Sequence, residues 1–104
     1  MNRLDHLKIM IESGDKDPFL QFALAKELEK LSLDEAIGTY EQLRKDDPAY
    51  VGLYYHLGKC YEKTNQMDLA VQCYQEGIAQ AKKQADFHAA SELNTALLSL
   101  EDDS

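Results

Sequence analysis

The sequence predicts an all-α protein in which about six antiparallel helices pack as successive hairpins. Apolar residues recur three and four positions apart along nearly the whole chain, and no stretch sustains the alternation typical of a β-strand. Capping residues, proline and glycine interrupt this pattern at short intervals. The chain also resembles itself at an offset of 34 residues, so the hairpins are expected to repeat along the chain.

Capping residues place the first three helices. We expect one helix over residues 3–13, ended by a Ser-Gly-Asp turn. The second begins at Asp17 and Pro18, because aspartate can accept from free amides and proline suits the first helical position. Ser32 has the spacing of a capping box with the acidic residue three positions on, so a third helix begins there. Pro48 ends it, because the residue before a proline is pushed out of the helical region.

The last three helices follow the same logic. The fourth is expected over about residues 50–64, and Asn65 supplies the left-handed turn that ends it, since asparagine tolerates that conformation. The fifth covers about residues 67–82. Asp86 can cap a sixth helix that runs to about residue 100, with an acidic tail behind it.

The repeat pairs residues across the middle of the chain. At the 34-residue offset the aligned pairs are Leu20 with Tyr54, Leu33 with Met67, Asp34 with Asp68, Ala36 with Ala70, Ile37 with Val71 and Tyr40 with Tyr74. Two helices and a turn in 34 residues resemble the tetratricopeptide repeat (TPR) family. The resemblance implies an α-α superhelix of helix hairpins in one domain. Its parts are an N-terminal flanking helix (1–16), two TPR-like repeats (17–50 and 51–84), and a C-terminal capping helix with the acidic tail (85–104).

The motif is most complete in the second repeat. The first helix of the family reads W-x2-L-G-x2-Y, and here Tyr54 takes the Trp place while Leu57, Gly58 and Tyr61 match. The second helix matches at Ala70 and Tyr74. In the first repeat Ala36, Tyr40 and Pro48 match, Leu20 and Ala23 are conservative replacements, and Leu24 and Glu27 depart from Gly and Tyr.

Gly58 needs a structural reason, because glycine inside a helix costs about 1 kcal/mol relative to alanine. Close approach of the partner helix supplies one, and the small Ala70 is expected where the two backbones come nearest. The stretch YYHLGKCY, residues 54–61, is therefore interpreted mainly as packing.

Composition excludes several classes of partner. The formal charge is −8, and no basic cluster exceeds the pair Lys82-Lys83, so nucleic acid is not expected as a partner. No apolar stretch approaches the roughly 18 residues of a membrane span, and the N-terminus has no signal-like apolar segment, so we expect a cytoplasmic protein with no membrane partner. Cys60 and Cys73 are then expected to be buried, reduced thiols.

The chain carries no recognisable catalytic constellation. There is no serine elbow and no glycine-rich phosphate loop, so neither an enzyme nor a bound cofactor is expected. His56 and Cys60 lie four apart and could present two ligands to a soft metal, with Cys73 and His88 as distant candidates for more. A metal-responsive adaptor is a third, minor hypothesis.

The resemblance implies a binding surface. In TPR arrays the first helix of each repeat lines a concave groove that holds a peptide. The corresponding positions are Gln21, Ala25, Leu28 and Glu29 in the first repeat and Tyr55, Lys59, Glu62 and Lys63 in the second, extended by Leu93 or Asn94. Tyr55 is the expected anchor. Lys59 and Lys63 could pair with a partner's carboxylate, unless Glu62 and Glu29 neutralise them.

Two functions are consistent with these features. The first is a non-catalytic adaptor that binds a protein or peptide segment in the groove. The alternative is a self-associating scaffold, a possible homodimer, in which Leu93, Leu97 and Leu100 of the last helix pair with a second copy. Because arrays usually need three or more repeats, either flanking helices or a second copy must cover the open ends.

Overall fold

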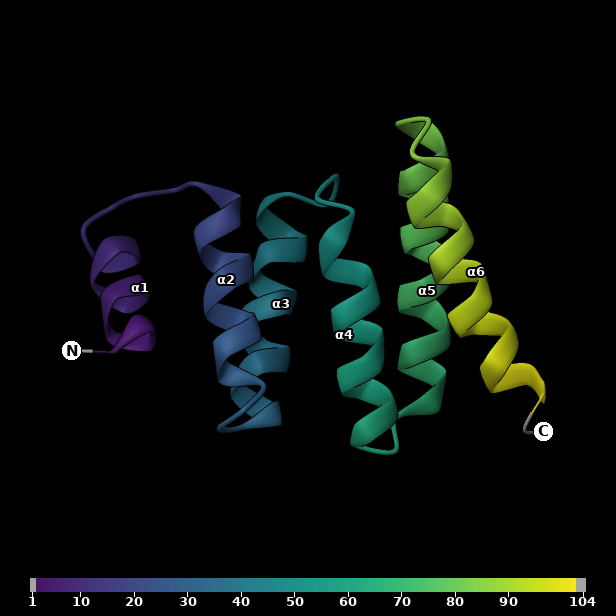
Figure 1. Cartoon of the computed structure of the whole chain (residues 1–104), viewed down its shortest axis with the longest axis horizontal. Coiled ribbons are helices and arrows are strands. Elements are labelled where there is room, and N and C mark those ends of the chain that lie inside the picture. Colours follow the sequence, from purple (N-terminus) through teal and green to yellow (C-terminus); the bar gives the residue numbers. More distant parts are fainter. Residues whose placement is uncertain (1, 103–104) are drawn as a thin grey trace. The chain divides into compact units, whose positions relative to one another are not determined.

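The computed structural model describes residues 2–102 and contains six helices in that range, with no strand. The chain divides into two compact units, Met1–Tyr50 and Val51–Ser104, called unit 1 and unit 2 below. Unit 1 holds α1 (Arg3–Glu12), α2 (Pro18–Leu28) and α3 (Leu33–Asp46). Unit 2 holds α4 (Gly52–Lys63), α5 (Met67–Lys83) and α6 (Phe87–Asp102) (Figure 1). The predicted all-α class is confirmed, and residues 103 and 104 of the expected acidic tail lie outside the described range.

The predicted caps are present. Asp17 accepts from the amide of Phe19 at 3.0 Å, Ser32 from that of Glu35 at 3.3 Å, and Asp86 from that of Ala89 at 3.1 Å. Asn65 has a φ of 59°, the left-handed conformation expected of it. Helix ends differ from the predicted ones by at most two residues, as frayed termini usually do.

Unit 1 packs α1 and α3 against α2. Leu7 of α1 meets Leu20 and Ala23 of α2 in one buried cluster, with Ile11 and Leu24 packed against it. Tyr40 and Leu43 of α3 are fully buried as well. Because α2 has a neighbour on each of two sides, most of its circumference is covered.

Unit 2 packs α5 between α4 and α6, and α4 also contacts α6. Tyr54 and Leu57 of α4, Tyr74 of α5 and Leu93 of α6 are all buried at 2% exposure or less. Gly58 leaves room for the partner helix α5, as expected. A Cβ on this residue would lie 2.2 Å from Cε1 of Tyr74, so the Tyr74 ring, rather than Ala70, occupies the space beside the glycine. A ring needs more room than a methyl group, which is why no side chain fits there.

Three buried tyrosines place their hydroxyl groups next to glutamate carboxylates. The hydroxyl of Tyr40 donates to Glu29 Oε2 at 2.5 Å in unit 1. In unit 2 the Tyr74 hydroxyl donates to Glu62, and the Tyr54 hydroxyl lies 3.4 Å from Glu76 Oε1. Each pair joins two helices of one hairpin, so the ring packs in the core while its polar tip is satisfied at the edge.

The Tyr74–Glu62 pair predicts alkaline sensitivity. Burial raises the pKa of Tyr74 above 10.0, and the hydrogen bond and negative charge of Glu62 raise it further. A folded-state pKa above the unfolded value of about 10 gives stability that is complete below that pH and is lost as the pH rises. We expect the free energy of unfolding to fall by up to about 1.4 kcal/mol per pH unit above about pH 10.

Urea unfolding at several pH values between about 9 and 11 measures this slope. Tyr74→Phe removes the ionising hydroxyl and keeps the ring, so its stability should depend less on pH than that of the wild type. Parallel curves for the two proteins would show that Tyr74 is not the source. Burial and the nearby Asp17 and Asp47 raise the pKa of Tyr50, so Tyr50 also lowers the stability at high pH. Its effect is the same in the wild type and in Tyr74→Phe.

Candidate functional site

Two of the predicted groove residues are buried. Ala25 is 0% exposed and Leu28 is 4% exposed, so the expectation that they face a partner as exposed residues is wrong. The physical reason is the covering of α2 by both α1 and α3, which leaves less of α2 free than one hairpin alone would. Leu28 instead lines a cavity between these helices.

Gln21 is the predicted groove residue of α2 with a specific polar environment. It is partly exposed, and its Nε2 donates to Asp46 Oδ2 at 3.2 Å. Its Oε1 is buried and accepts no hydrogen bond. A buried acceptor without a donor costs free energy, so a donor brought by a bound partner would be favoured at this atom.

The candidates of α4 form a continuous surface, which we call the Tyr55 patch: Tyr55, His56, Lys59 and Glu62. Tyr55 is 36% exposed. Lys59 Nζ lies 5.6 Å from the centre of its ring, and the ring of His56 meets it edge-on at 5.8 Å. Tyr55 and Lys59 are four positions apart, and Lys59 and Glu62 are three apart. Side chains at these spacings lie on the same face of a helix.

Glu62 connects the Tyr55 patch to the core. Its Oε2 lies 3.4 Å from Lys59 Nζ and also accepts from the Tyr74 hydroxyl. The predicted neutralisation of Lys59 by Glu62 is therefore confirmed, whereas Glu29 accepts from Tyr40. The result is an aromatic ring at the surface with the Glu62-paired ammonium group of Lys59 held above it, an arrangement that offers apolar contact and N–H donors. Lys63 is exposed at the end of the same helix.

The cysteines are buried and not joined in a disulfide, as predicted. Cys60 is 0% exposed and Cys73 is 2% exposed. Across residues 2–102, no group of three His, Cys, Asp or Glu side chains is placed to hold a metal ion. His88, the most distant candidate, lies 2.5 Å from Glu92 on its own helix. Over the same range, every helix is too short or too polar to cross a membrane.

The leucines predicted to join two copies are mostly internal. Leu93 is 2% exposed and Leu97 is 9% exposed, so neither is available as a dimer contact or as an extension of the groove. They are buried because the apolar stripe of α6 that contains them packs against α4 and α5. One methyl group of Leu93 would lie 2.9 Å from a Cβ added at Gly77. The apolar residues that α6 does expose are Phe87 and Leu98, at 69% and 48%.

Comparison with known proteins assigns the repeat. A family model described as tetratricopeptide repeat matches residues 28–93. A solution structure of a tetratricopeptide repeat domain protein from Salinibacter ruber is 41% identical over 84% of this chain and 89% of that chain, with a TM-score of 0.80. A crystal structure of a tetratricopeptide repeat domain protein from the same organism is 40% identical over 85% and 100%, also with a TM-score of 0.80.

A third similar structure covers nearly the whole chain. The solution structure of a protein from Bordetella parapertussis is 25% identical over 99% of this chain and 90% of that chain, with a TM-score of 0.86. No curated protein matches the sequence.

Proposed function

The chain belongs to the tetratricopeptide repeat family, and on that premise we propose that it is a non-catalytic adaptor whose exposed α4 residues bind a peptide or protein segment. The observation that supports this most strongly is the Tyr55 patch. Exposed aromatic rings concentrate binding energy, and the ammonium group held above the ring adds N–H donors for a polar group of the partner. Two buried cysteines without a disulfide suit the reducing cytoplasm, where we place this binding.

Replacing Tyr55 with alanine is expected to weaken capture of the natural partner without unfolding the chain. Removal of an aromatic anchor typically costs 2 kcal/mol or more, which is about a 30-fold loss of affinity. Stability should change by only about 0.5 kcal/mol, because the residue is at the surface. Affinity capture from the cells of origin, quantified by mass spectrometry and followed by titration with the recovered partner, measures the effect.

Two variants serve as comparisons. Lys59→Ala removes the charge above the ring and should weaken the same partner less than Tyr55→Ala does. Met67→Ala removes an apolar side chain that is 45% exposed at the start of α5, outside the patch, and should leave capture unchanged. If all three variants recover the partner as the wild type does, the assignment of α4 is wrong.

Self-association is the second candidate function. Phe87 and Leu98 support it, because these two large apolar side chains of α6 are exposed. They would take the place of Leu93 and Leu97 as contacts with a second copy. Sedimentation velocity over a wide concentration range separates the two candidates. A constant mass near 11.8 kDa would reject self-association, while a dimer dissociated by Leu98→Ser would support it.

A further inference from the structure

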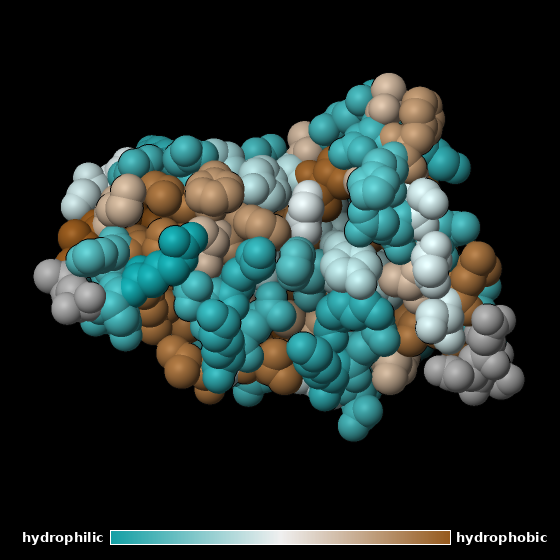
Figure 2. Space-filling model, in the orientation of Figure 1, coloured by the Kyte–Doolittle hydropathy of each residue, from teal (hydrophilic) through white to brown (hydrophobic). Residues whose placement is uncertain are grey.

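Unit 1 contains a groove formed by two adjoining cavities of about 430 Å³ each. Both are lined by Ile11 of α1 and Gln21 of α2, so Gln21 stands where they meet. We call the two together the unit 1 groove. Apolar side chains also reach the surface over α1 and α2 in the view of Figure 2. The volume of each cavity falls within the range of natural binding pockets.

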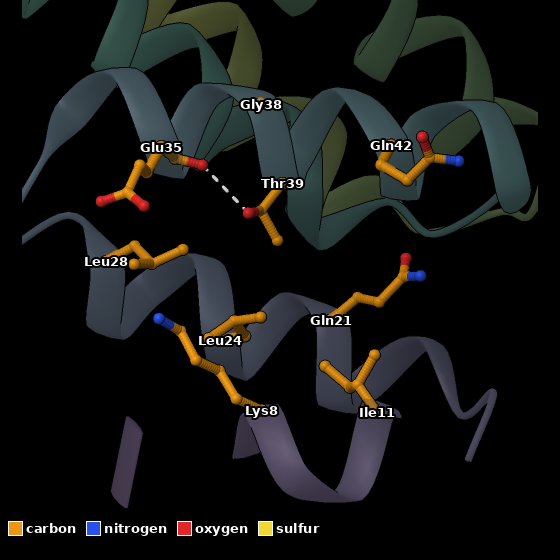
Figure 3. A pocket seen from close by; sticks show the side chains of 9 residues that line it. All are labelled: Lys8, Ile11, Gln21, Leu24, Leu28, Glu35, Gly38, Thr39 and Gln42. Carbon is orange, nitrogen blue, oxygen red and sulfur yellow. Dashed lines mark hydrogen bonds between the residues drawn. The ribbon is translucent and has the colours of Figure 1, made fainter. Parts of the chain in front are cut away.

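One end of the unit 1 groove is apolar. Leu24 and Leu28 of α2 and Ile11 of α1 form the apolar part of its lining, and α3 supplies the opposite wall (Figure 3). Lys8 of α1 and Glu35 of α3, one cation and one anion, also line it. Gly38 contributes no side chain to that wall, and a Cβ added there would have no atom within 4 Å. Leu24 stands at the repeat position where unit 2 has Gly58. The space beside Gly58 is filled by the Tyr74 ring, whereas the space at Gly38 is open.

The other end is acidic. Asp15, Asp46 and Asp47 line the second cavity, together with a single ammonium group, that of Lys16. Asp46 is held in place by two side-chain amides, because Gln21 donates to it at 3.2 Å and Gln42 donates at 2.9 Å. Three carboxylates beside one lysine make this end complementary to a cation.

Gln21 points to a ligand with an N–H group at the middle of the unit 1 groove. Its Nε2 is used by Asp46, while its Oε1 is buried and accepts no hydrogen bond. The partner that this position lacks is a donor. A peptide backbone provides such donors at regular intervals, so a chain that runs from the apolar end to the acidic end can supply one when the Gln21 side chain turns toward it.

We propose that the unit 1 groove binds a segment of another protein in which apolar side chains are followed by a lysine or arginine. The apolar side chains contact Ile11 and Leu24, a backbone N–H donates to Gln21, and the cationic side chain is attracted by Asp46 and the other two aspartates. This surface belongs to unit 1, so it is separate from the Tyr55 patch in unit 2 and adds a second site to the adaptor function proposed above.

Selection from a displayed library of random twelve-residue peptides against the full chain tests the proposal. We expect enrichment of peptides with two or more apolar residues followed by lysine or arginine. Gly38→Phe, which places a ring in the open wall, should weaken the enriched peptides about ten- to hundredfold. Gly38→Ala is its matched control and should bind as the wild type does. Asp46→Asn removes the charge and one of the two acceptor oxygens, and should weaken binding about three- to tenfold.

The alternative outcomes are distinct. The proposal is overturned if no peptide is enriched, if the enriched peptides are acidic, or if Gly38→Phe binds them unchanged while circular dichroism shows it folded. A homodimer that Gly38→Phe dissociates would assign the unit 1 groove to a second copy and also overturn it. Tyr55→Ala should not affect these peptides, so failure of the Tyr55 prediction and failure of this one are distinguishable.

Discussion

Replacing Gly58 with alanine is expected to destabilise unit 2 by about 2–3 kcal/mol. The added Cβ would lie 2.2 Å from Cε1 and 2.7 Å from Cζ of Tyr74, distances that no pair of carbon atoms tolerates. The Tyr74 ring cannot simply swing away, because it is fully buried and its hydroxyl is held by Glu62. The clash therefore outweighs the gain of about 1 kcal/mol that alanine brings to a helix.

Urea unfolding measures this effect, and Gly38→Ala provides the matched control. Gly38 also lies inside a helix, but a Cβ there meets no atom within 4 Å, so alanine should raise stability by up to about 1 kcal/mol. A second test combines Gly58→Ala with Tyr74→Leu, which removes the ring. The double variant should lose less stability than the sum of the single losses. Additive losses would mean that the contact between Gly58 and Tyr74 is not the cause.

Replacing Gly77 with alanine is expected to cost about 1–2 kcal/mol. Here the added Cβ would lie 2.6 Å from Cβ of Tyr54 and 2.9 Å from Cδ1 of Leu93. The Cβ of Tyr54 is fixed to the α4 backbone, so relief requires the helices to move apart. The stability of a Gly77 variant therefore depends on the packing of both α4 and α6 against α5.

The measurement is again urea unfolding, combined with amide hydrogen exchange to locate the loss. We expect reduced protection in α4, α5 and α6, because the clash separates α5 from two neighbours. Leu93→Ala in the Gly77→Ala background removes one of the two clashes, but it also opens a cavity, so it should not restore wild-type stability. A Gly77→Ala protein as stable as the wild type would contradict the packing of α5 described here.

Local chemistry made the helices predictable. Ser32, Asp17 and Asp86 act within three residues of their own positions, so their effects can be read without knowledge of the tertiary structure. The left-handed turn at Asn65 is equally local. Ala85, with a φ of 57°, was not predicted, because alanine carries no preference for that conformation.

Packing between helices was harder to predict. Helix periodicity places Ala70 and Tyr74 on the same side of α5, but it does not say which of them fills the notch at Gly58. Similarly, the repeat motif assigns Ala25 and Leu28 to the exposed side of α2. It does not include α1, whose packing on α2 accompanies their burial.

The unit 1 groove was missed, although two residues could have signalled it. Leu24 departs from the motif glycine, and Gly38 is a glycine on the other helix of the same repeat. Together they indicate that this hairpin is packed differently from the second one. The cavity itself depends on how α1 and α3 are spaced across α2, and spacing between helices is not encoded by any single residue.

The most direct test of the adaptor function is photocrosslinking from position 55 in living cells. A photoreactive phenylalanine analogue at this position should form an adduct with a different protein, and the same analogue at Gln72, which is exposed on α5, should not. An adduct specific to position 55 is the predicted result. The absence of any such adduct, or an adduct only with a second copy of the chain, would contradict the proposal that α4 binds a partner.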